Sequence, residues 1–424
     1  MGSIRKKIKK KTKNKSLVNG TLFSIYSFIN RSFSFILLMV LANYITPSEY
    51  GYLSLWGTIV MIIGYFISMS TDGYLEVSYF REGELGITNV FSCIFFTTLI
   101  SGTIFLILLL CIGEWVSNLI DLPVISLYFA LVISFFMVYS NLHLNLYRIK
   151  GKIRQYGVVS CSNALLNLIL SILLVKFFQQ GWMGRMNAQL FCFSLFGIIG
   201  LFVFINNKHL KIPDISFWKK MLIWGIPLIP HLATNFIRQG CDRYIIDIYH
   251  SIEDVGLFSF ALNLATIISM VGMGFNQSNS VDIYKVLGDK DSNNVSKKNK
   301  LLGQRKFIGG VYLIFTVLMI LGCYMFIPIV FPKYLNAIGY IPILSVYALF
   351  VCLYYLYTNY LFYYNKTKNI MYVTFGSALV HLCLSLFLTK YSLYWTCVVY
   401  CFTQFGVFVL IRYMAMRELE NQLS

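Results

Sequence analysis

Stretches of about 20 consecutive apolar residues follow one another along almost the whole chain, separated by short polar segments. A run of this length crosses the hydrocarbon core of a membrane as an α-helix, whereas barrel strands alternate in stretches of about 10 residues. Of the 424 residues, 58% are hydrophobic and 12% charged, far from a soluble domain. The chain is therefore predicted to be an all-α integral membrane protein. Twelve transmembrane helices are expected, at about 17–45, 51–70, 87–112, 122–146, 156–178, 186–205, 218–240, 255–280, 307–330, 340–364, 370–389 and 392–413.

Lysine and arginine are distributed unevenly between the two sides of this arrangement. Short loops that carry positive charge stay in the cytoplasm. With the N-terminus inside, 28 of the 35 Lys and Arg lie in inner segments and 6 in outer ones, while Arg31 lies within the first span. Both termini are therefore expected to be cytoplasmic. The net charge of +18 then reflects topology and anionic inner-leaflet lipid rather than nucleic-acid binding.

The expected division of the chain follows from these spans and loops. It comprises a basic cytoplasmic tail at 1–16, an N-terminal six-helix bundle at 17–206, a cytoplasmic linker at 207–220, a C-terminal six-helix bundle at 221–414 and a cytoplasmic tail at 415–424.

The two halves of the chain share a weak internal repeat with an offset of 205 residues. In both copies an acidic residue, Glu49 or Asp254, stands two places before a repeated glycine. Repeats of this kind are typical of transporters built from two related halves. The repeated residues are Gly20 and Gly225, Asn30 and Asn235, Gly51 and Gly256, and Ser54 and Ser259.

Polar and ionisable side chains within the first and seventh spans are the strongest indication of a functional site. An Arg or Asp at the centre of a spanning helix costs about 2.5–3.5 kcal/mol, so such residues need a polar cavity or one another. The repeat would set the polar residues of the two spans opposite each other across a central cleft, which predicts a cationic cavity. The alternatives are an arginine used for helix packing and ion pairs that neutralise one another at the helix edge. The residues are Asn30 and Arg31 in the first span and Asn235, Arg238, Asp242 and Arg243 in the seventh.

Further candidate residues lie in the tenth and eleventh spans. Tyr357 and Tyr360 recur at helical spacing in a tyrosine-rich segment, which is typical of an aromatic belt at the membrane surface and also suits stacking on sugars. His381 is either a proton relay or a core histidine whose hydrogen bonds are satisfied.

Several kinds of chemistry have no motif in the sequence. No P-loop occurs, so energy must come from an ion gradient such as H⁺ or Na⁺, from a partner, or from the gradient of the substrate. The spacing of Cys and His does not predict a metal site. We therefore expect neither a cofactor nor a metal, and no partner nucleic acid.

The seventh span and the segment after it resemble the most recognisable part of the Wzx-type polysaccharide biosynthesis flippases. The matching residues read GIPLIPH and CDRYIIDIYHSIEDVGLFSFALNLA, and three weaker matches are TPSEYGYLSL, TDGYLEVSYFR and GWMGRMNAQ. The resemblance extends from about residue 16 to about residue 415. It implies two pseudo-symmetric six-helix bundles around a central cavity, as in the multidrug/oligosaccharidyl-lipid/polysaccharide exporter superfamily.

This resemblance implies a transporter and not an enzyme. Such a protein would flip an undecaprenyl-diphosphate-linked oligosaccharide across the bacterial inner membrane by alternating access, for O-antigen (lipopolysaccharide) or capsule assembly. Arg31, Arg238 and Arg243 would hold the diphosphate or acidic sugars, while Asp242 would tune those arginines or take part in ion coupling. The implied partners are the lipid-linked substrate, membrane lipids, a polysaccharide polymerase and its chain-length machinery.

Two other functions fit the sequence less well. A multidrug cation antiporter of the same superfamily would need an acidic cavity, and no acid lies deep in the first span. A membrane-embedded polysaccharide polymerase or glycosyltransferase commonly bears a large outer loop, whereas every outer loop expected here is short.

Overall fold

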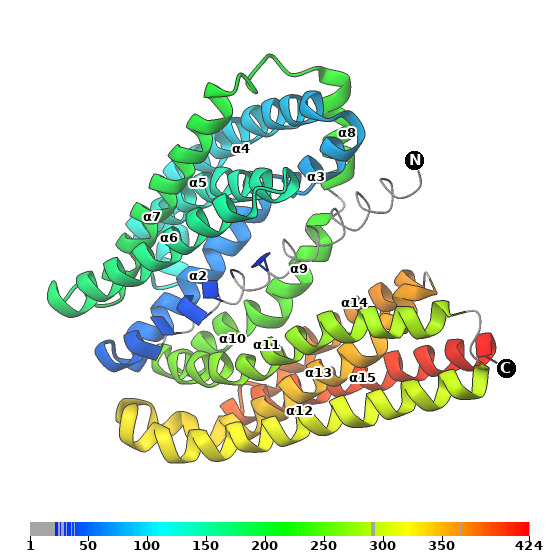
Figure 1. Cartoon of the computed structure of the whole chain (residues 1–424). Helices are drawn as coiled ribbons and strands as arrows, with labels where there is room; N and C mark the ends of the chain where they lie inside the picture. The colour runs from blue at the N-terminus through cyan, green and yellow to red at the C-terminus, as the bar shows by residue number, and fades with distance from the viewer. Residues whose placement is uncertain are drawn as a thin grey trace, which may run out of the picture. The chain divides into compact units, whose positions relative to one another are not determined.

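A computed structural model describes residues 39–226, 228–289, 293–364 and 366–423, together with positions 22, 23, 26, 29, 30, 32–34, 36 and 37 of the first predicted span. Every regular element in this part of the chain is a helix (Figure 1). Ten of the described helices are long and apolar enough to cross a membrane. They coincide with the second to sixth and the eighth to twelfth predicted spans. The prediction of an all-α membrane protein is therefore confirmed.

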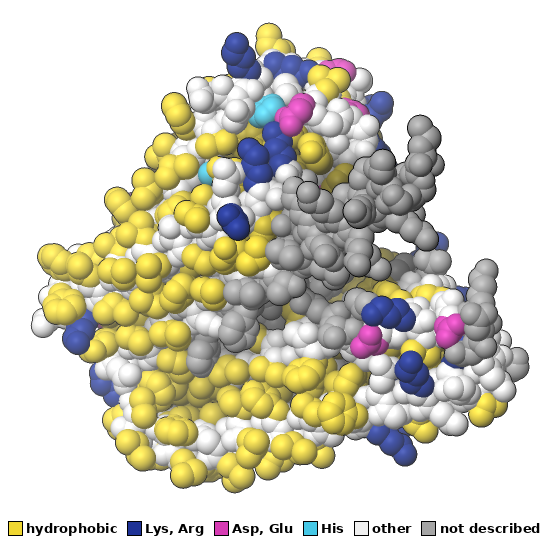
Figure 2. All heavy atoms as spheres, viewed as in Figure 1, with side chains coloured by type: hydrophobic (Ala, Val, Ile, Leu, Met, Phe, Trp, Pro, Cys, Tyr) yellow, Lys and Arg dark blue, Asp and Glu magenta, His cyan; other side chains and the backbone are white. Residues whose placement is uncertain are grey.

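Large hydrophobic side chains cover the outer sides of these helices. Leu110 and Trp115 on one long helix are 68% and 64% exposed, and Ile329 on another is 80% exposed. Figure 2 shows hydrophobic side chains over large parts of the visible face, with few Lys and Arg among them. Such surfaces are stable in lipid, where apolar side chains need not be turned inward.

Internal contacts divide the chain into two units. The first consists of Met1–Ile45 and Trp56–Ala233, and the second of Thr46–Leu55 and Thr234–Ser424. The start of α2 (Pro47–Ile67) thus belongs to the second unit, whereas the rest of this helix belongs to the first.

The first unit is built mainly from helices that are neighbours along the chain. Its further elements are α3 (Tyr74–Glu82), α4 (Glu84–Leu119), α5 (Val124–Ile149), α6 (Ile153–Ile172), the π-helix η1 (Leu173–Phe177), α7 (Gly181–Asn206), α8 (Ile215–Gly225) and the beginning of α9 (Leu228–Gln239). α7 packs against α5 and α6, and α4 packs against α5. Gly197 and Gly200 allow α7 to approach the backbone of α5 closely.

The second unit has α13 at its centre. Its further elements are the end of α9, α10 (Cys241–Tyr249), α11 (Ile252–Gly288), α12 (Asn294–Val330), the 3-10 segment η2 (Pro332–Tyr340), α13 (Ile341–Tyr363), α14 (Thr367–Leu388) and α15 (Leu393–Leu423). α13 packs against α11, α12 and α15, and α14 packs against α15 and α10. These helices supply all the side chains of the site described below.

The predicted seventh span at 218–240 is not one helix, and that prediction is wrong in this respect. The segment contains the end of α8 and the whole of α9, and α10 begins just beyond it, so that the helices are separated after Gly225 and at Gly240. Glycine weakens a helix interior by about 1 kcal/mol relative to alanine, which favours breaks at these positions. Arg238 and Asp242 therefore lie on different helices rather than on one continuous face.

One pair of residues from the internal repeat, Gly51 and Gly256, meets where α2 and α11 begin. Thr46 and Glu49 form a capping box at the start of α2, with backbone N–H to side-chain distances of 2.8 and 3.2 Å. Ser251 and Asp254, 205 positions later, cap α11, where the Asp254 N–H donates to the Ser251 hydroxyl at 3.1 Å.

The repeated glycines lie just behind these caps and bring the two helices together. A Cβ on Gly51 would collide with the carbonyl oxygen of Ile252, and a Cβ on Gly256 would collide with that of Pro47. Gly51 thus contacts Ile252, four positions before its counterpart Gly256. In the same way, Gly256 contacts Pro47, four positions before Gly51. The contact is reciprocal, as expected for two copies of one motif around a two-fold axis.

Candidate functional site

The structure brings together only part of the predicted site. Arg31 and the side chain of Asn235 lie outside the described residues. Asn30 lies in the first unit, and its buried side-chain oxygen accepts no hydrogen bond there. The other predicted residues, which are Arg238, Asp242, Arg243, Tyr357 and Tyr360, all lie in the second unit.

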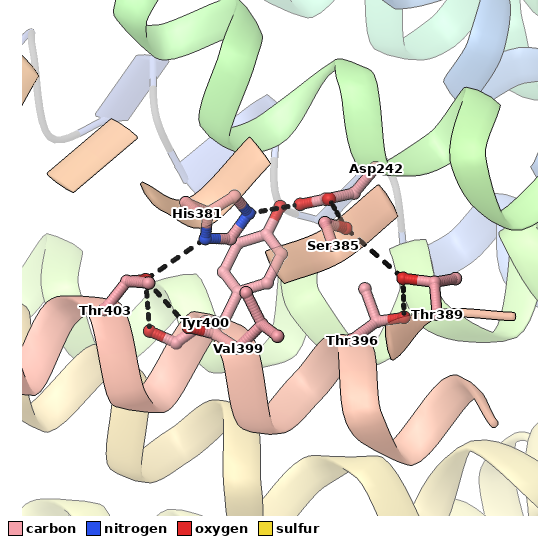
Figure 3. A network of polar contacts seen from close by, with 8 residues as sticks. All are labelled: Asp242, His381, Ser385, Thr389, Thr396, Val399, Tyr400 and Thr403. Carbon is pink, nitrogen blue, oxygen red and sulfur yellow. Dashed lines mark hydrogen bonds and ion pairs between the residues drawn. The ribbon is translucent and has the colours of Figure 1, made fainter. Parts of the chain in front are cut away.

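Asp242 is the centre of a buried polar network between α10, α14 and α15 (Figure 3). Its side chain is fully buried, and each carboxylate oxygen has a partner. One oxygen lies 2.7 Å from Nε2 of His381, and the hydroxyl of Ser385 donates to the other. A buried carboxylate is tolerated when it is hydrogen-bonded in this way.

His381 bridges the carboxylate of Asp242 and the hydroxyl of Thr403. Its Nε2 faces Asp242, and its Nδ1 lies 3.1 Å from the Thr403 hydroxyl, which also lies 2.7 Å from the carbonyl of Val399. The two ring nitrogens thus each have a polar partner, and the tautomer sets which of them donates. The sequence left open whether His381 is a proton relay or a core histidine. In the structure its partner is Asp242, which is itself an ionisable group.

A chain of hydroxyl groups continues from Asp242 towards the loop between α14 and α15. Ser385 lies 3.2 Å from the Thr389 hydroxyl, which lies 2.9 Å from that of Thr396. His250, at the end of α10, bonds through Nε2 to the backbone carbonyl of Thr389. These hydroxyls extend the buried network as far as Thr389, just past the end of α14, and Thr396 on α15.

Arg238 is held by neutral groups. Its guanidinium donates to Gln404 and to Ser377, both at 2.8 Å, and its Nε is buried without a hydrogen bond. The Ser377 hydroxyl in turn donates to the carbonyl of Thr403, at 3.2 Å, which links this arginine to the network around Asp242. The predicted alternative of an ion pair between Arg238 and Asp242 is not what the structure contains.

Arg243 is also without a carboxylate partner among the described residues, and its Nε donates to the Ser259 hydroxyl at 3.3 Å. Arg243 lies on α10 together with the acids Asp242 and Asp247.

Tyr357 and Tyr360 belong to a different cluster. Tyr360 is fully buried among the side chains of Leu361, Ile411 and other residues at the far ends of α13 and α15, and Tyr357 packs against the same cluster. No described hydrogen bond or ring contact joins them to Asp242.

Sequence reasoning missed the hydroxyl and amide groups that complete the site. The positions 381, 385 and 389 follow one another at i, i+4 and i+8, so they share one face of α14 and give a signal that could have been used. Nothing in the sequence pairs that face with Asp242. The missed residues are Ser377, Ser385, Thr389, Thr396, Thr403 and Gln404.

Comparison with protein families identifies the family of this chain. Residues 16–281, more than half of the sequence, match the family described as polysaccharide biosynthesis protein. The chain belongs to the polysaccharide biosynthesis protein family. A protein of the Lsg locus of Haemophilus influenzae is 23% identical over 263 residues, which are 60% of this chain and 63%, or less than two thirds, of that protein. An uncharacterized membrane protein of Haemophilus influenzae is 23% identical over 82% of this chain and 84% of that one.

Solved structures place this member of the polysaccharide biosynthesis family in a known transporter fold. An inward-facing multidrug resistance MATE transporter of the MOP superfamily matches with a TM-score of 0.74 and 12% identity, over 94% of this chain and 95% of that one. An outward-facing MATE transporter matches with a TM-score of 0.62 and 13% identity, over 95% of each chain. A MOP superfamily transporter from Pyrococcus furiosus, described as having a binding pocket of reverse polarity, matches with 0.62 and 14%, over 95% and 96%. The chain is therefore a multi-pass membrane protein of the polysaccharide biosynthesis family, with the fold of these transporters.

Proposed function

We propose that the protein is a flippase, which carries an undecaprenyl-diphosphate-linked oligosaccharide across the bacterial inner membrane by alternating access. The observation that carries this proposal is Arg238, whose guanidinium is bound by neutral groups and has no carboxylate partner among the described residues. A diphosphate that crosses hydrocarbon needs fixed cations along its path. A guanidinium suits this role because its planar fork binds phosphate oxygens in pairs.

The rest of the cationic path is proposed from the internal repeat. Arg243 adds a second charge near Arg238, while Asn30, Arg31 and Asn235 would line the path as the matching polar residues of the two halves. O-antigen and capsule repeat units are the two classes of cargo that we propose, and both are made on a diphosphate-linked lipid. A polysaccharide polymerase and its chain-length machinery are the proposed partners.

We also propose that transport is coupled to proton movement through Asp242 and His381. The two ionisable side chains are in direct contact in a buried site, and the hydroxyls of Ser385, Thr389 and Thr396 extend the network from them. Both carboxylate oxygens of Asp242 are already bound, one by the imidazole and one by a hydroxyl hydrogen. This favours H⁺ over Na⁺, because Na⁺ would need those oxygens as ligands.

A second candidate function is a multidrug cation antiporter, which is favoured by the likeness of the fold to multidrug resistance transporters. Arg238 argues against it, because its guanidinium has only neutral partners among the described residues and would repel an organic cation.

The proposal is tested in a strain that lacks the chromosomal copy of this gene. Lipid-linked oligosaccharide should accumulate on the inner leaflet, and the wild-type gene should restore surface polysaccharide. Arg238→Gln and Arg31→Ala should be inserted at normal levels yet restore little polysaccharide, whereas Arg81→Gln, at an exposed position, should act as wild type. Normal polysaccharide with Arg238→Gln would refute the role of this arginine. Dye efflux that depends on Asp242 would favour the antiporter.

A further inference from the structure

Two arginines at one end of the second unit lie over the same tyrosine ring. The guanidinium carbon of Arg305, on α12, is 5.9 Å from the ring centroid of Tyr357 and 5.6 Å from that of Tyr360. The guanidinium carbon of Arg412, on α15, is 6.0 Å from the ring of Tyr357. The three helices that supply these residues run side by side (Figure 1). One aromatic surface on α13 thus holds two cations near each other.

Neither guanidinium has an ion-pair partner among the described residues. Two acids at this end of the unit pair with lysines, Glu418 with Lys366 at 3.5 Å and Asp282 with Lys285 at 3.7 Å. Arg305 donates to the thioether sulfur of Met416, which is a weak acceptor, and its oxygen neighbour is the neutral hydroxyl of Tyr360. Among the described residues, the two guanidinium groups therefore have no carboxylate acceptor.

The two tyrosine rings are held in place by packing, whereas Arg412 is accessible from outside. Tyr360 is fully buried, and its hydroxyl makes no hydrogen bond of normal geometry, with Arg305 as its charged neighbour. Both rings pack on the apolar cluster that includes Leu301, Leu361 and Ile411. Arg412 is exposed, so a ligand can reach the pair of arginines from outside.

We propose that Arg305 and Arg412, held over Tyr357, form a binding site for a phosphate group carried on a membrane lipid. Phosphate offers several charged acceptor oxygens, and guanidinium forks bind them bidentately. Basic pockets between membrane helices bind lipid head groups in the same way. The phosphate belongs either to a phospholipid head group or to a prenyl diphosphate. The site does not depend on the proposed flippase function, because its residues are distinct from those around Asp242.

Lipid binding to the purified full-length chain tests this site directly. The chain is placed in nanodiscs of phosphatidylcholine, and the binding of added phosphatidylglycerol, of farnesyl diphosphate and of inorganic diphosphate is measured by native mass spectrometry. The double variant Arg305→Gln/Arg412→Gln should bind the phosphate lipid about tenfold or more weakly, because it loses charge-assisted hydrogen bonds. Arg417→Gln, an exposed arginine on the same helix as Arg412, should bind as the wild type does.

A second variant separates recognition from folding. Arg305→Lys/Arg412→Lys keeps the charge but not the planar fork, so its affinity should lie between those of the wild type and the glutamine variant. Thermal unfolding in phosphatidylcholine alone checks that all variants are folded.

The pattern of ligands identifies the source of the phosphate. Preference for farnesyl diphosphate supports the proposal and assigns a prenyl diphosphate, and preference for phosphatidylglycerol supports it and assigns a phospholipid.

Equal lipid binding by the wild type and the double glutamine variant would overturn the proposal. Binding of inorganic diphosphate more tightly than either lipid would also overturn it, because the lipid would then contribute nothing. Loss of binding in the double variant with normal polysaccharide assembly would leave both this site and the proposed flippase standing.

Discussion

At the level of single residues, the pair formed by Asp242 and His381 is the most informative feature. Both side chains are buried, and Nε2 of His381 lies 2.7 Å from one carboxylate oxygen of Asp242. The other polar contacts of the pair are to the hydroxyls of Thr403 and Ser385. Two ionisable groups in direct contact bind and release protons as a pair rather than independently.

Replacing Asp242 by Asn should separate transport from stability. The amide keeps hydrogen bonds to His381 and Ser385 but cannot exchange a proton, so abundance and thermal unfolding should be close to wild type. Polysaccharide export should fall by about 5–150-fold, the range of ordinary coupling energies, and should lose its dependence on external pH. Asp282→Asn, which removes only a surface ion pair, is the matched control. Wild-type export by Asp242→Asn would disprove proton coupling at this residue.

At the level of elements, the loop between α7 and α8 is anchored to α4 through His209. Nδ1 of His209 lies 2.9 Å from the Thr88 hydroxyl, and the Ser92 hydroxyl donates to the His209 carbonyl at 3.1 Å. Burial and the nearby Lys150 lower the pKa of His209 below its ordinary value of 6.5, and Glu84 opposes this shift. The neutral form of His209 is therefore more strongly favoured in the folded chain than in the unfolded one.

The pH dependence of stability should report this histidine. Because the pKa of His209 is lower in the folded chain than in the unfolded one, the unfolded chain binds more protons below about pH 6.5. The free energy of unfolding should thus fall as the pH drops below this value. His209→Gln should lose less stability over the same range, as measured by thermal unfolding in detergent between about pH 7.5 and 5.5. Identical pH profiles for both proteins would contradict the assignment.

The contact between the starts of α2 and α11 makes a second prediction at this level. Gly256→Ala should destabilise the protein by about 1–3 kcal/mol, because the added methyl group would collide with the carbonyl of Pro47. Gly274→Ala in the same helix should be neutral or stabilising, since a Cβ there meets nothing within 4 Å. Thermal unfolding of the two variants provides the measurement. Equal stability of both would show that the two helices are not in close contact.

The limits of prediction from sequence also lie at this level. Apolar length located the spans, because a helix in lipid must satisfy its own backbone. The breaks at Gly225 and Gly240 were missed because the apolar pattern continues across them. The importance of Arg238 and Asp242 was visible from the cost of burying charge, whereas their partners Gln404, Ser377 and Ser385 come from helices more than 130 residues away in sequence. Periodicity within one helix does not contain that information.

For the whole molecule, the distribution of Lys and Arg predicts the orientation in the membrane. A green fluorescent protein fused after residue 424 should fluoresce and an alkaline phosphatase fused there should be inactive, because both termini are expected in the cytoplasm. Alkaline phosphatase inserted after Lys333, between α12 and α13, should be active. The reverse pattern would invert the proposed direction of transport.

The meeting of Gly51 and Gly256 has a consequence for how the two halves of this gene can change. A side chain gained at one glycine presses on the turn that caps the opposite helix, and the same holds in the other direction. A mutation at either glycine therefore disturbs both helices, so the two positions cannot change independently. If the chain arose by duplication, this small patch is where the ancestral sequence would be erased last.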